Sequence, residues 1–426
     1  MQATGDFMQP SLRRLTHTAV AALALAFGAA GSARAADTQL LDAARAAEPA
    51  LIQSLKDMVS IESGSTNAAG LAQMASFTEA RLKALGASTE RIAVTQGPGT
   101  MVKGTLTGTG KRRIMLIAHM DTVYGPNTLA TQPIKLDGNR LYGPGIADDK
   151  GGIAVILHAL AILQAAGWKD YAQITVLFNP DEEVGSLGSG DTIAKLAEQH
   201  DVVLSCEPSA GSVVMKGQPL LLAAAGVATA TLDVKGRAAH AGAAPELGRN
   251  ALYELSYQML QTREVAKDVP GAALIWTQAN TNGPLNQITE KASAVGDVRL
   301  TQPDAQDKLQ AALQAKVSAS KLVPDTETTV KVISGRPPYV SDARSRALAA
   351  KAQAIYKEID RELALVPQTG GGTDAGFAVR SGKATVLESF GLAGFGYHAR
   401  DEYIEIDSIV PRLYLMSRIL QEIGRN

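Results

Sequence analysis

The sequence predicts an α/β protein in which a mixed sheet is covered by helices and a second, α+β domain is inserted into the chain. The first observation is size, because 426 residues, 46% of them apolar, suffice for two domains with their own cores. The second is that short apolar runs alternate with helical stretches up to about residue 208. The third is that this alternation stops between about residues 224 and 335 and then returns.

The charge balance and the cysteine count exclude several classes of protein. Lysine and arginine number 41 against 42 acidic residues, a net charge of −1, so we expect no basic surface for nucleic acid. The apolar content excludes intrinsic disorder. Cys206 is the only cysteine, so no internal disulfide can form. Packing, hydrogen bonds or a metal must therefore stabilise the fold.

The first 35 residues have the features of a signal peptide. Arg13 and Arg14 precede an apolar run at 19–30, which is followed by a small-residue site at 33–35. The run is too short to span a bilayer, and no polar face interrupts it, as an amphipathic helix would require. We therefore expect a mature chain that begins near Ala36, is periplasmic or secreted and has no membrane attachment. The arginine pair leaves the export route open.

In chain order, the pattern begins with helices and continues with buried strands. Apolar residues recur every three or four positions over 38–85, which predicts helix. Apolar runs at 114–118, 174–178 and 202–204 predict buried strands, and each is followed within a few residues by acidic side chains or histidine. In an open α/β sheet, ligands bind at the carboxyl ends of the strands, so we expect the functional site there.

The interrupted stretch has its own order of elements, with strand and helix patterns at 228–234, 250–262, 297–300 and 304–318. After it we expect a helix at 342–359, a strand at 384–387 and a closing helix after Pro411. The predicted boundaries are a signal peptide at 1–35, a catalytic domain in two parts at 36–223 and 336–426, and an inserted domain at 224–335.

Five side chains have the chemistry of metal ligands: His119, Asp148, Glu183, Glu207 and His398. Singly, each has a simpler explanation, since a histidine in a glycine-rich loop is commonly structural and an acidic triplet commonly begins a helix. Three of the five, however, follow predicted strands, where buried carboxylates would be costly unless cations neutralised them. Two imidazoles and three carboxylates suit zinc, and one shared carboxylate would allow two ions.

Three long motifs make the chain similar to a known family. They read Tyr-Gly-Pro-Gly-Ile-Ala-Asp-Asp-Lys-Gly-Gly at 142–152, His-Ala-Gly-Ala-Ala-Pro-Glu-Leu-Gly at 240–248 and Gly-Gly-Gly-Thr-Asp-Ala at 370–375. The chain thereby resembles the co-catalytic zinc exopeptidases and amidohydrolases, which include aminoacylases, acetylornithine deacetylase, succinyl-diaminopimelate desuccinylase and glutamate carboxypeptidases of the carboxypeptidase G type. The resemblance covers essentially the whole mature chain and is strongest to the last of these. It implies a zinc-exopeptidase-like catalytic domain, an inserted dimerisation domain and two zinc ions in each chain.

The resemblance also assigns the metal ligands. Asp148 would bridge the two ions, with His119 and Glu207 completing one and Glu183 and His398 the other. The ligand set is the same as the one that the residue chemistry indicates.

Three catalytic roles follow from the resemblance. Asp121 would accept the second N–H of His119 and so orient the ring, the alternative being a cap at the strand end. Glu182 would be the general base, because it adjoins a ligand without being one; the alternative is an acidic helix cap. His240 would reach the active site of the partner subunit and stabilise the oxyanion, which makes a homodimer the catalytic unit. Taken alone, His240 is a surface loop histidine.

Substrate contacts are expected mainly after the insert. Arg336 offers a guanidinium, and the turn formed by Gly370, Gly371 and Gly372 offers backbone N–H groups, both suited to a carboxylate. Without the resemblance these would be a surface arginine and a flexible loop. Asn286 matches a family position that also contacts substrate, although its neighbours differ.

The predicted function is zinc-dependent hydrolysis of the amide bond to a C-terminal amino acid in N-acyl amino acids, peptides or folate-type substrates. An N-deacylase, aminoacylase or dipeptidase of the same family is the alternative. A non-catalytic periplasmic binding protein is a more remote alternative, because it would need neither Glu182 nor His240.

The segment that opens the inserted domain departs from that of glutamate carboxypeptidases. Where they carry a lysine and a serine that hold the substrate's glutamate side chain, alignment from Gly226 places Pro219 and Leu221, with Lys216 at a shifted position. Leucines there predict a relaxed or apolar preference. Glutamate release from folates is the competing expectation.

Overall fold

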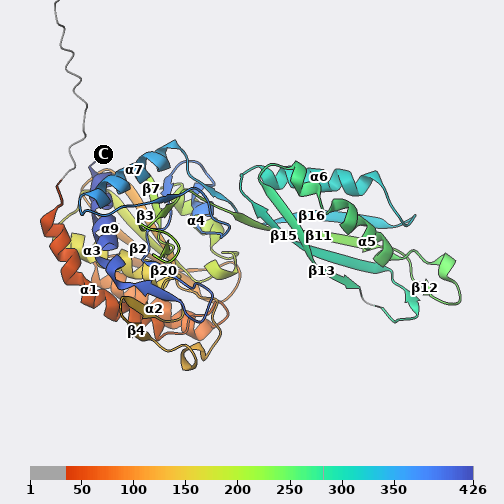
Figure 1. Cartoon of the computed structure of the whole chain (residues 1–426), viewed down its shortest axis with the longest axis horizontal. Helices are drawn as coiled ribbons and strands as arrows, with labels where there is room; N and C mark the ends of the chain where they lie inside the picture. Colours follow the sequence, from red (N-terminus) through yellow and green to blue (C-terminus); the bar gives the residue numbers. More distant parts are fainter. Residues whose placement is uncertain (1–34, 282, 426) are drawn as a thin grey trace, which may run out of the picture. The chain divides into compact units, whose positions relative to one another are not determined.

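A computed structural model describes residues 35–281 and 283–425. The predicted signal peptide lies outside these described residues, apart from Ala35. Over the same residues, no helix combines the length and the apolar character needed to cross a membrane. The predicted fold class is confirmed: a mixed sheet covered by helices and an inserted α+β domain (Figure 1).

A six-stranded mixed sheet forms the centre of the larger domain. Strands β6, β3, β7 and β19 run parallel, and the antiparallel strands β2 and β1 extend the sheet beyond β6. The carboxyl ends of the four parallel strands therefore meet at one edge. The predicted strands at 114–118, 174–178, 202–204 and 384–387 are confirmed. In spatial order the strands are β1 (Ser88–Ala93), β2 (Thr100–Thr107), β6 (Gln173–Asn179), β3 (Arg113–His119), β7 (Val202–Ser205) and β19 (Thr385–Leu387).

Side chains of the central strand β3 alternate between two cores. Ile114, Leu116 and Ala118 are buried in a large cluster that includes residues of α1, α2, α3, α7 and α9. Met115 and Ile117 belong to a second cluster with residues of α4 and α8. The two-residue repeat of a strand produces this alternation, and burial on both faces explains why β3 is apolar from Ile114 to Ala118. The helices are α1 (Thr38–Val59), α2 (Ala68–Ala84), α3 (Lys150–Ala165), α4 (Gly190–Ala197), α7 (Ala343–Lys357), α8 (Ala375–Val379) and α9 (Ile409–Gly424).

A second sheet consists of five short strands, which the sequence did not predict. Strand β4 is exposed throughout, and none of the five exceeds three residues, so no hydrophobic period marks them. Two of them lead to the candidate ligands: β5 precedes the loop of Asp148, and β20 precedes His398. In spatial order the strands are β4 (Lys135–Asp137), β5 (Arg140–Tyr142), β21 (Tyr403–Glu405), β20 (Ala393–Phe395) and β8 (Ser209–Ala210).

The inserted domain has a four-stranded antiparallel sheet and two helices around a core of its own. In β11, Ala228, Ala230, Leu232 and Val234 are buried, while the residues between them are partly or fully exposed. This alternation shows that one face of the sheet packs inward. The predicted elements at 228–234, 250–262, 297–300 and 304–318 are confirmed. In spatial order the strands are β13 (Ala272–Thr281), β15 (Lys291–Leu300), β11 (Gly226–Lys235) and β16 (Glu327–Arg336); the helices are α5 (Ala251–Thr262) and α6 (Ala305–Ala319).

The chain enters and leaves the inserted domain through two paired segments. Strand β10 (Ala223–Ala224) precedes β11, and β17 (Tyr339–Val340) follows β16. The two pair antiparallel, so entry and exit lie next to each other. Strand β16 runs through Arg336, one position past the predicted end of the insert at 335.

Candidate metal centre and its cavity

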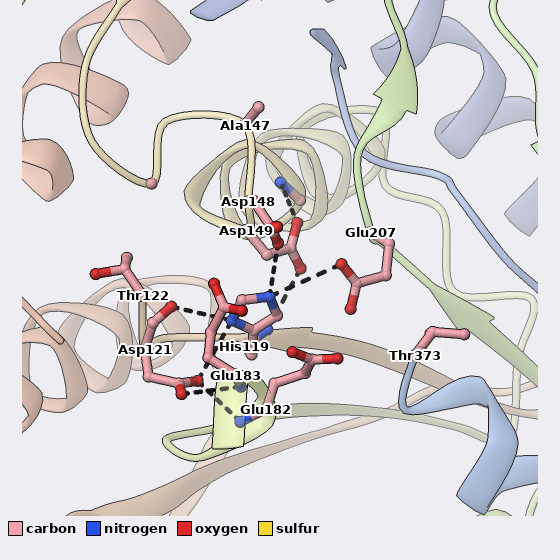
Figure 2. A network of polar contacts seen from close by, with 12 residues as sticks. His119, Asp121, Thr122, Ala147, Asp148, Asp149, Glu182, Glu183, Glu207 and Thr373 are labelled. Carbon is pink, nitrogen blue, oxygen red and sulfur yellow. Dashed lines mark hydrogen bonds and ion pairs between the residues drawn. The ribbon is translucent and has the colours of Figure 1, made fainter. Parts of the chain in front are cut away.

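The carboxyl ends of the parallel strands carry several of the predicted site residues. Strand β3 ends with His119, opposite Asn179 at the end of β6. Glu182 and Glu183 follow β6 in a short 3-10 helix, and Glu207 follows β7. Figure 2 shows that these side chains converge from separate strands. They lie at the edge of the sheet where an α/β fold binds ligands.

Asp148 lies between the two candidate histidines. Its Oδ1 is 3.0 Å from Nε2 of His119, and its Oδ2 is 3.4 Å from Nε2 of His398. A further carboxylate stands beside each imidazole, since Oε2 of Glu207 is 3.8 Å from Nε2 of His119 and Oε2 of Glu183 is 3.0 Å from Nε2 of His398. The five side chains thus form two groups, each with one imidazole and one carboxylate, and Asp148 joins them.

The centre concentrates negative charge away from solvent. Burial raises the pKa of Glu207 and of Glu183. Hydrogen bonds to Asp148 and Glu183 raise the pKa of His398 to about 10. Burial lowers the pKa of His119, but the surrounding carboxylates, Glu207 first, outweigh burial and raise it. Such a cluster calls for positive charge, which protonated imidazoles or divalent cations can supply.

The donor atoms fit a divalent metal. Those of His119, Asp148 and Glu183 lie within 4.8 Å of one another, as do those of His119, Asp149 and Glu207. Oε1 of Glu183 is buried without a hydrogen-bond partner. Asp149, by contrast, is occupied: one oxygen caps α3, and the other accepts the N–H of His119. Imidazole and carboxylate donors suit zinc.

Glu182 is held by an arginine. Glu182 is 5% exposed, and its Oε1 is 2.6 Å from Nη1 of Arg336, which also donates to the main-chain carbonyl of Glu182. Burial raises the pKa of Glu182 to about 8, although Arg336 acts to lower it. A carboxyl group with a pKa near neutrality can both accept and donate a proton at physiological pH. The guanidinium predicted to bind a substrate carboxylate therefore contacts Glu182 in this structure.

Asp121 supports the histidine and the acidic pair at once. Its carboxylate accepts the N–H groups of Glu182 and Glu183 at 3.0 and 3.1 Å and the hydroxyl of Ser65 at 2.8 Å. Nδ1 of His119 is 3.0 Å from the main-chain carbonyl oxygen of Asp121 and 3.3 Å from its carboxylate. The nearer partner of the ring is thus the carbonyl, whereas the sequence prediction named the carboxylate.

The sequence prediction missed Glu402, a buried carboxylate that holds the loop of Asp148. Its oxygens accept the N–H groups of Gly145, Ala147 and Asp148 at 2.9, 2.9 and 3.0 Å and the hydroxyl of Tyr124 at 2.7 Å. Burial raises the pKa of Glu402 to about 7. No motif indicates this role, because Glu402 is 254 positions from Asp148 and meets the loop only in the folded chain.

A cavity of about 1090 Å³ surrounds the centre. Arg336, Gly371 and Gly372 line it, and so does Arg299 of β15, a cation that the sequence prediction did not name. Gly370, the first glycine of the predicted turn, does not belong to the described lining of the cavity. The predicted site residues that line the cavity besides these are Asp148, Glu182, Glu183, Glu207 and His398.

His240 and Asn286 do not line the described cavity of their own chain. His240 is exposed and ends β12 (Ala239–His240) of the inserted domain (Figure 1). Strand β12 pairs with β14 (Gln287–Ile288). Asn286 is also exposed, and its carbonyl accepts the N–H of the residue after His240 at 2.8 Å. The structure therefore places these two residues beside each other and apart from the candidate ligands.

Comparison with known proteins gives consistent matches. A model of peptidase family M20/M25/M40 matches residues 115–422. Carboxypeptidase G2 of Pseudomonas sp. (strain RS-16) is 42% identical over 421 residues, which cover 98% of this chain and 99% of that protein.

Two solved structures share the fold. Aminopeptidase PepT of Bacillus cereus ATCC 10987 has a TM-score of 0.70 at 19% identity and covers 88% of this chain and 98% of its own. The M20 family metallo-carboxypeptidase Sso-CP2 of Sulfolobus solfataricus has a TM-score of 0.68 at 16% identity, with coverage of 88% and 99%.

Proposed function

Because the chain belongs to peptidase family M20/M25/M40 and is a metallo-carboxypeptidase similar to carboxypeptidase G2, we propose that it hydrolyses the amide bond to a C-terminal amino acid at a pair of zinc ions. The observation that carries this proposal is the position of Asp148, whose two oxygens face different imidazoles. One shared carboxylate would let each ion gain an imidazole and a second carboxylate.

The same geometry supports a division of the ligands. His119 and Glu207 would hold one ion with Asp148, and Glu183 and His398 would hold the other with the same Asp148. Each imidazole already lies beside the carboxylate with which it would share its ion.

Glu182 is the general base of the proposed reaction. When bound, the metal pair polarises the scissile carbonyl and acidifies a water. Glu182 accepts a proton from the attacking water and delivers it to the leaving amine, a task that its burial and raised pKa support. Arg336 binds the substrate's α-carboxylate with the glycine turn at 370–372. When the substrate arrives, Arg336 exchanges Glu182 for this carboxylate, which frees Glu182 for the water.

The active site is completed by a second copy of the chain. His240 and Asn286 adjoin each other on the inserted domain, and both are exposed. In a homodimer they enter the partner's cavity, where His240 stabilises the oxyanion and Asn286 contacts the substrate. The leader-like features of residues 1–35 support a periplasmic or secreted location.

Metal analysis of freshly purified protein tests the proposal. We expect about two zinc ions per chain, and fewer in His119→Ala. Hydrolysis of an N-acyl amino acid should stop on chelation, return with zinc and be weak for the methyl ester, which offers Arg336 no carboxylate. Hydrolysis that survives complete metal removal would contradict the mechanism.

A further inference from the structure

We propose that the cavity receives an apolar side chain of the substrate's C-terminal residue, such as leucine or phenylalanine, rather than a second carboxylate. This inference rests on the proposed carboxypeptidase function and names its substrate class. The observation that carries it is a set of six apolar residues of the larger domain that belong to the cavity lining and are called the apolar wall: Val214, Met215, Pro219, Leu220, Leu221 and Val366.

Backbone pairing holds this apolar wall in place. Strand β9 (Leu220–Leu221) pairs in parallel with β18 (Leu365–Val366), with Leu221 opposite Val366. The N–H of Leu222 also donates to the carbonyl of Val366 at 2.9 Å. These bonds fix the register of Leu220 and Leu221 beside the cavity.

Each arginine among the described residues of the lining already has an acidic partner. Arg336 pairs with Glu182 and is the proposed partner of the substrate's α-carboxylate. Nε of Arg299 donates to Oδ2 of Asp297 at 2.9 Å. A glutamate side chain would have to compete with Asp297 for Arg299 or remain unpaired against leucine, whereas an apolar side chain does neither.

Lys216 does not supply the missing charge. Its side chain is exposed, and Lys216 is absent from the described lining, although its neighbour Met215 is present. The competing expectation of glutamate release therefore lacks a free cation along the apolar wall.

The decisive measurement is kcat/KM for one acyl group joined to leucine, phenylalanine and glutamate, made with zinc-loaded full-length enzyme. We expect leucine or phenylalanine to exceed glutamate by at least about tenfold. A smaller ratio, or a preference for glutamate, overturns the inference while leaving the carboxypeptidase function intact. If zinc-loaded enzyme hydrolysed none of the three, the proposed function itself would be wrong.

A charge placed in the wall provides an independent test. Leu221→Lys should raise the ratio of glutamate to leucine hydrolysis by at least about tenfold, because it creates the missing ion pair. Val213→Lys is the matched control: Val213 is 54% exposed and outside the described lining, so the ratio should change by less than about threefold. Thermal unfolding and zinc content verify that both variants fold. If the ratio is unchanged in folded Leu221→Lys, the apolar wall does not contact the side chain of the substrate's C-terminal residue, and the inference is wrong.

Discussion

Two opposing effects act on the carboxyl group of Glu182. Burial favours the neutral acid, and the guanidinium of Arg336 favours the carboxylate, with the result that the pKa rises to about 8. The carboxylate of Asp121 accepts the main-chain N–H of Glu182 and so fixes the backbone at this position. The side chain can therefore change its partner while its backbone stays in place.

Glu182→Gln should keep both metals and the fold but lower kcat by several powers of ten. The amide can still hydrogen-bond to water, but it cannot accept a proton, and general-base catalysis contributes roughly a hundredfold to ten-thousandfold. Kinetics and metal analysis on the same preparation measure the effect. Glu183→Gln, one position further, is the matched control and should lose metal. More than roughly a tenth of wild-type turnover in Glu182→Gln would be too much for the proposed base.

The residues that sequence analysis could find are those with a local signal. His119 is the last residue of a strand, Glu207 lies two positions after one, and Asp148 lies in a long motif. Glu402 and Arg299 have no such signal: Glu402 acts through backbone N–H groups, and Arg299 becomes part of the site only because β15 borders the cavity. Their roles depend on contacts between distant segments, which no local pattern encodes.

Among the elements, the loop before α3 depends on one carboxylate for its shape. Glu402→Gln places an amide N–H₂ where backbone N–H groups or the Tyr124 hydroxyl now donate, so Asp148 should lose its fixed position. We expect zinc affinity to fall by roughly tenfold to a hundredfold, as is usual when a residue behind a metal ligand is removed. Competition with a chromophoric chelator measures this change. Glu405→Gln is the control, because Glu405 is similarly buried but accepts from Ser212; an equal loss in both variants would exclude a specific role for Glu402.

Helix α3 carries a histidine that should make the free energy of unfolding depend on pH. His158 is 6% exposed, with Nε2 3.0 Å from Oγ of Ser54 on α1, and burial, reinforced by Arg81, lowers its pKa from 6.5 to about 4. Between these values the unfolded chain binds more protons, so the free energy of unfolding should fall as pH falls, by on the order of 3 kcal/mol. His158→Gln removes the titrating group and should flatten this part of the profile. Urea unfolding of both proteins at pH 7 and pH 4.5 measures the change in the free energy of unfolding with pH. An equal change in the two proteins would exclude His158 as the cause.

At the scale of the whole molecule, the proposed dimer predicts complementation. Chains with His240→Ala keep Glu182, and chains with Glu182→Gln keep His240, so a mixed dimer contains one complete active site. Random pairing of equal amounts should restore roughly a quarter of wild-type activity from two nearly inactive proteins. Subunit exchange must be verified with differently tagged chains. If exchange occurs and no activity returns, His240 acts in its own chain or not at all.

The overall architecture was predictable where hydrophobic patterns are long. The parallel strands are apolar because both of their faces are buried, and β11 alternates because only one of its faces is buried. The five-stranded second sheet was not predictable from the sequence. Strands of two or three residues show no hydrophobic period, and they are defined only by pairing with remote segments. The homodimer remains a prediction.

The paired segments β10 and β17 have a consequence for the order of events during synthesis. All strands of the inserted sheet lie within one continuous stretch, from Gly226 to Arg336, so its core is complete as soon as that stretch has left the ribosome. The larger domain must wait for β19 and α9 near the end of the chain. Its nascent first part therefore stays unfinished while the insert folds, and the closing of β17 against β10 joins the two halves once the insert has formed.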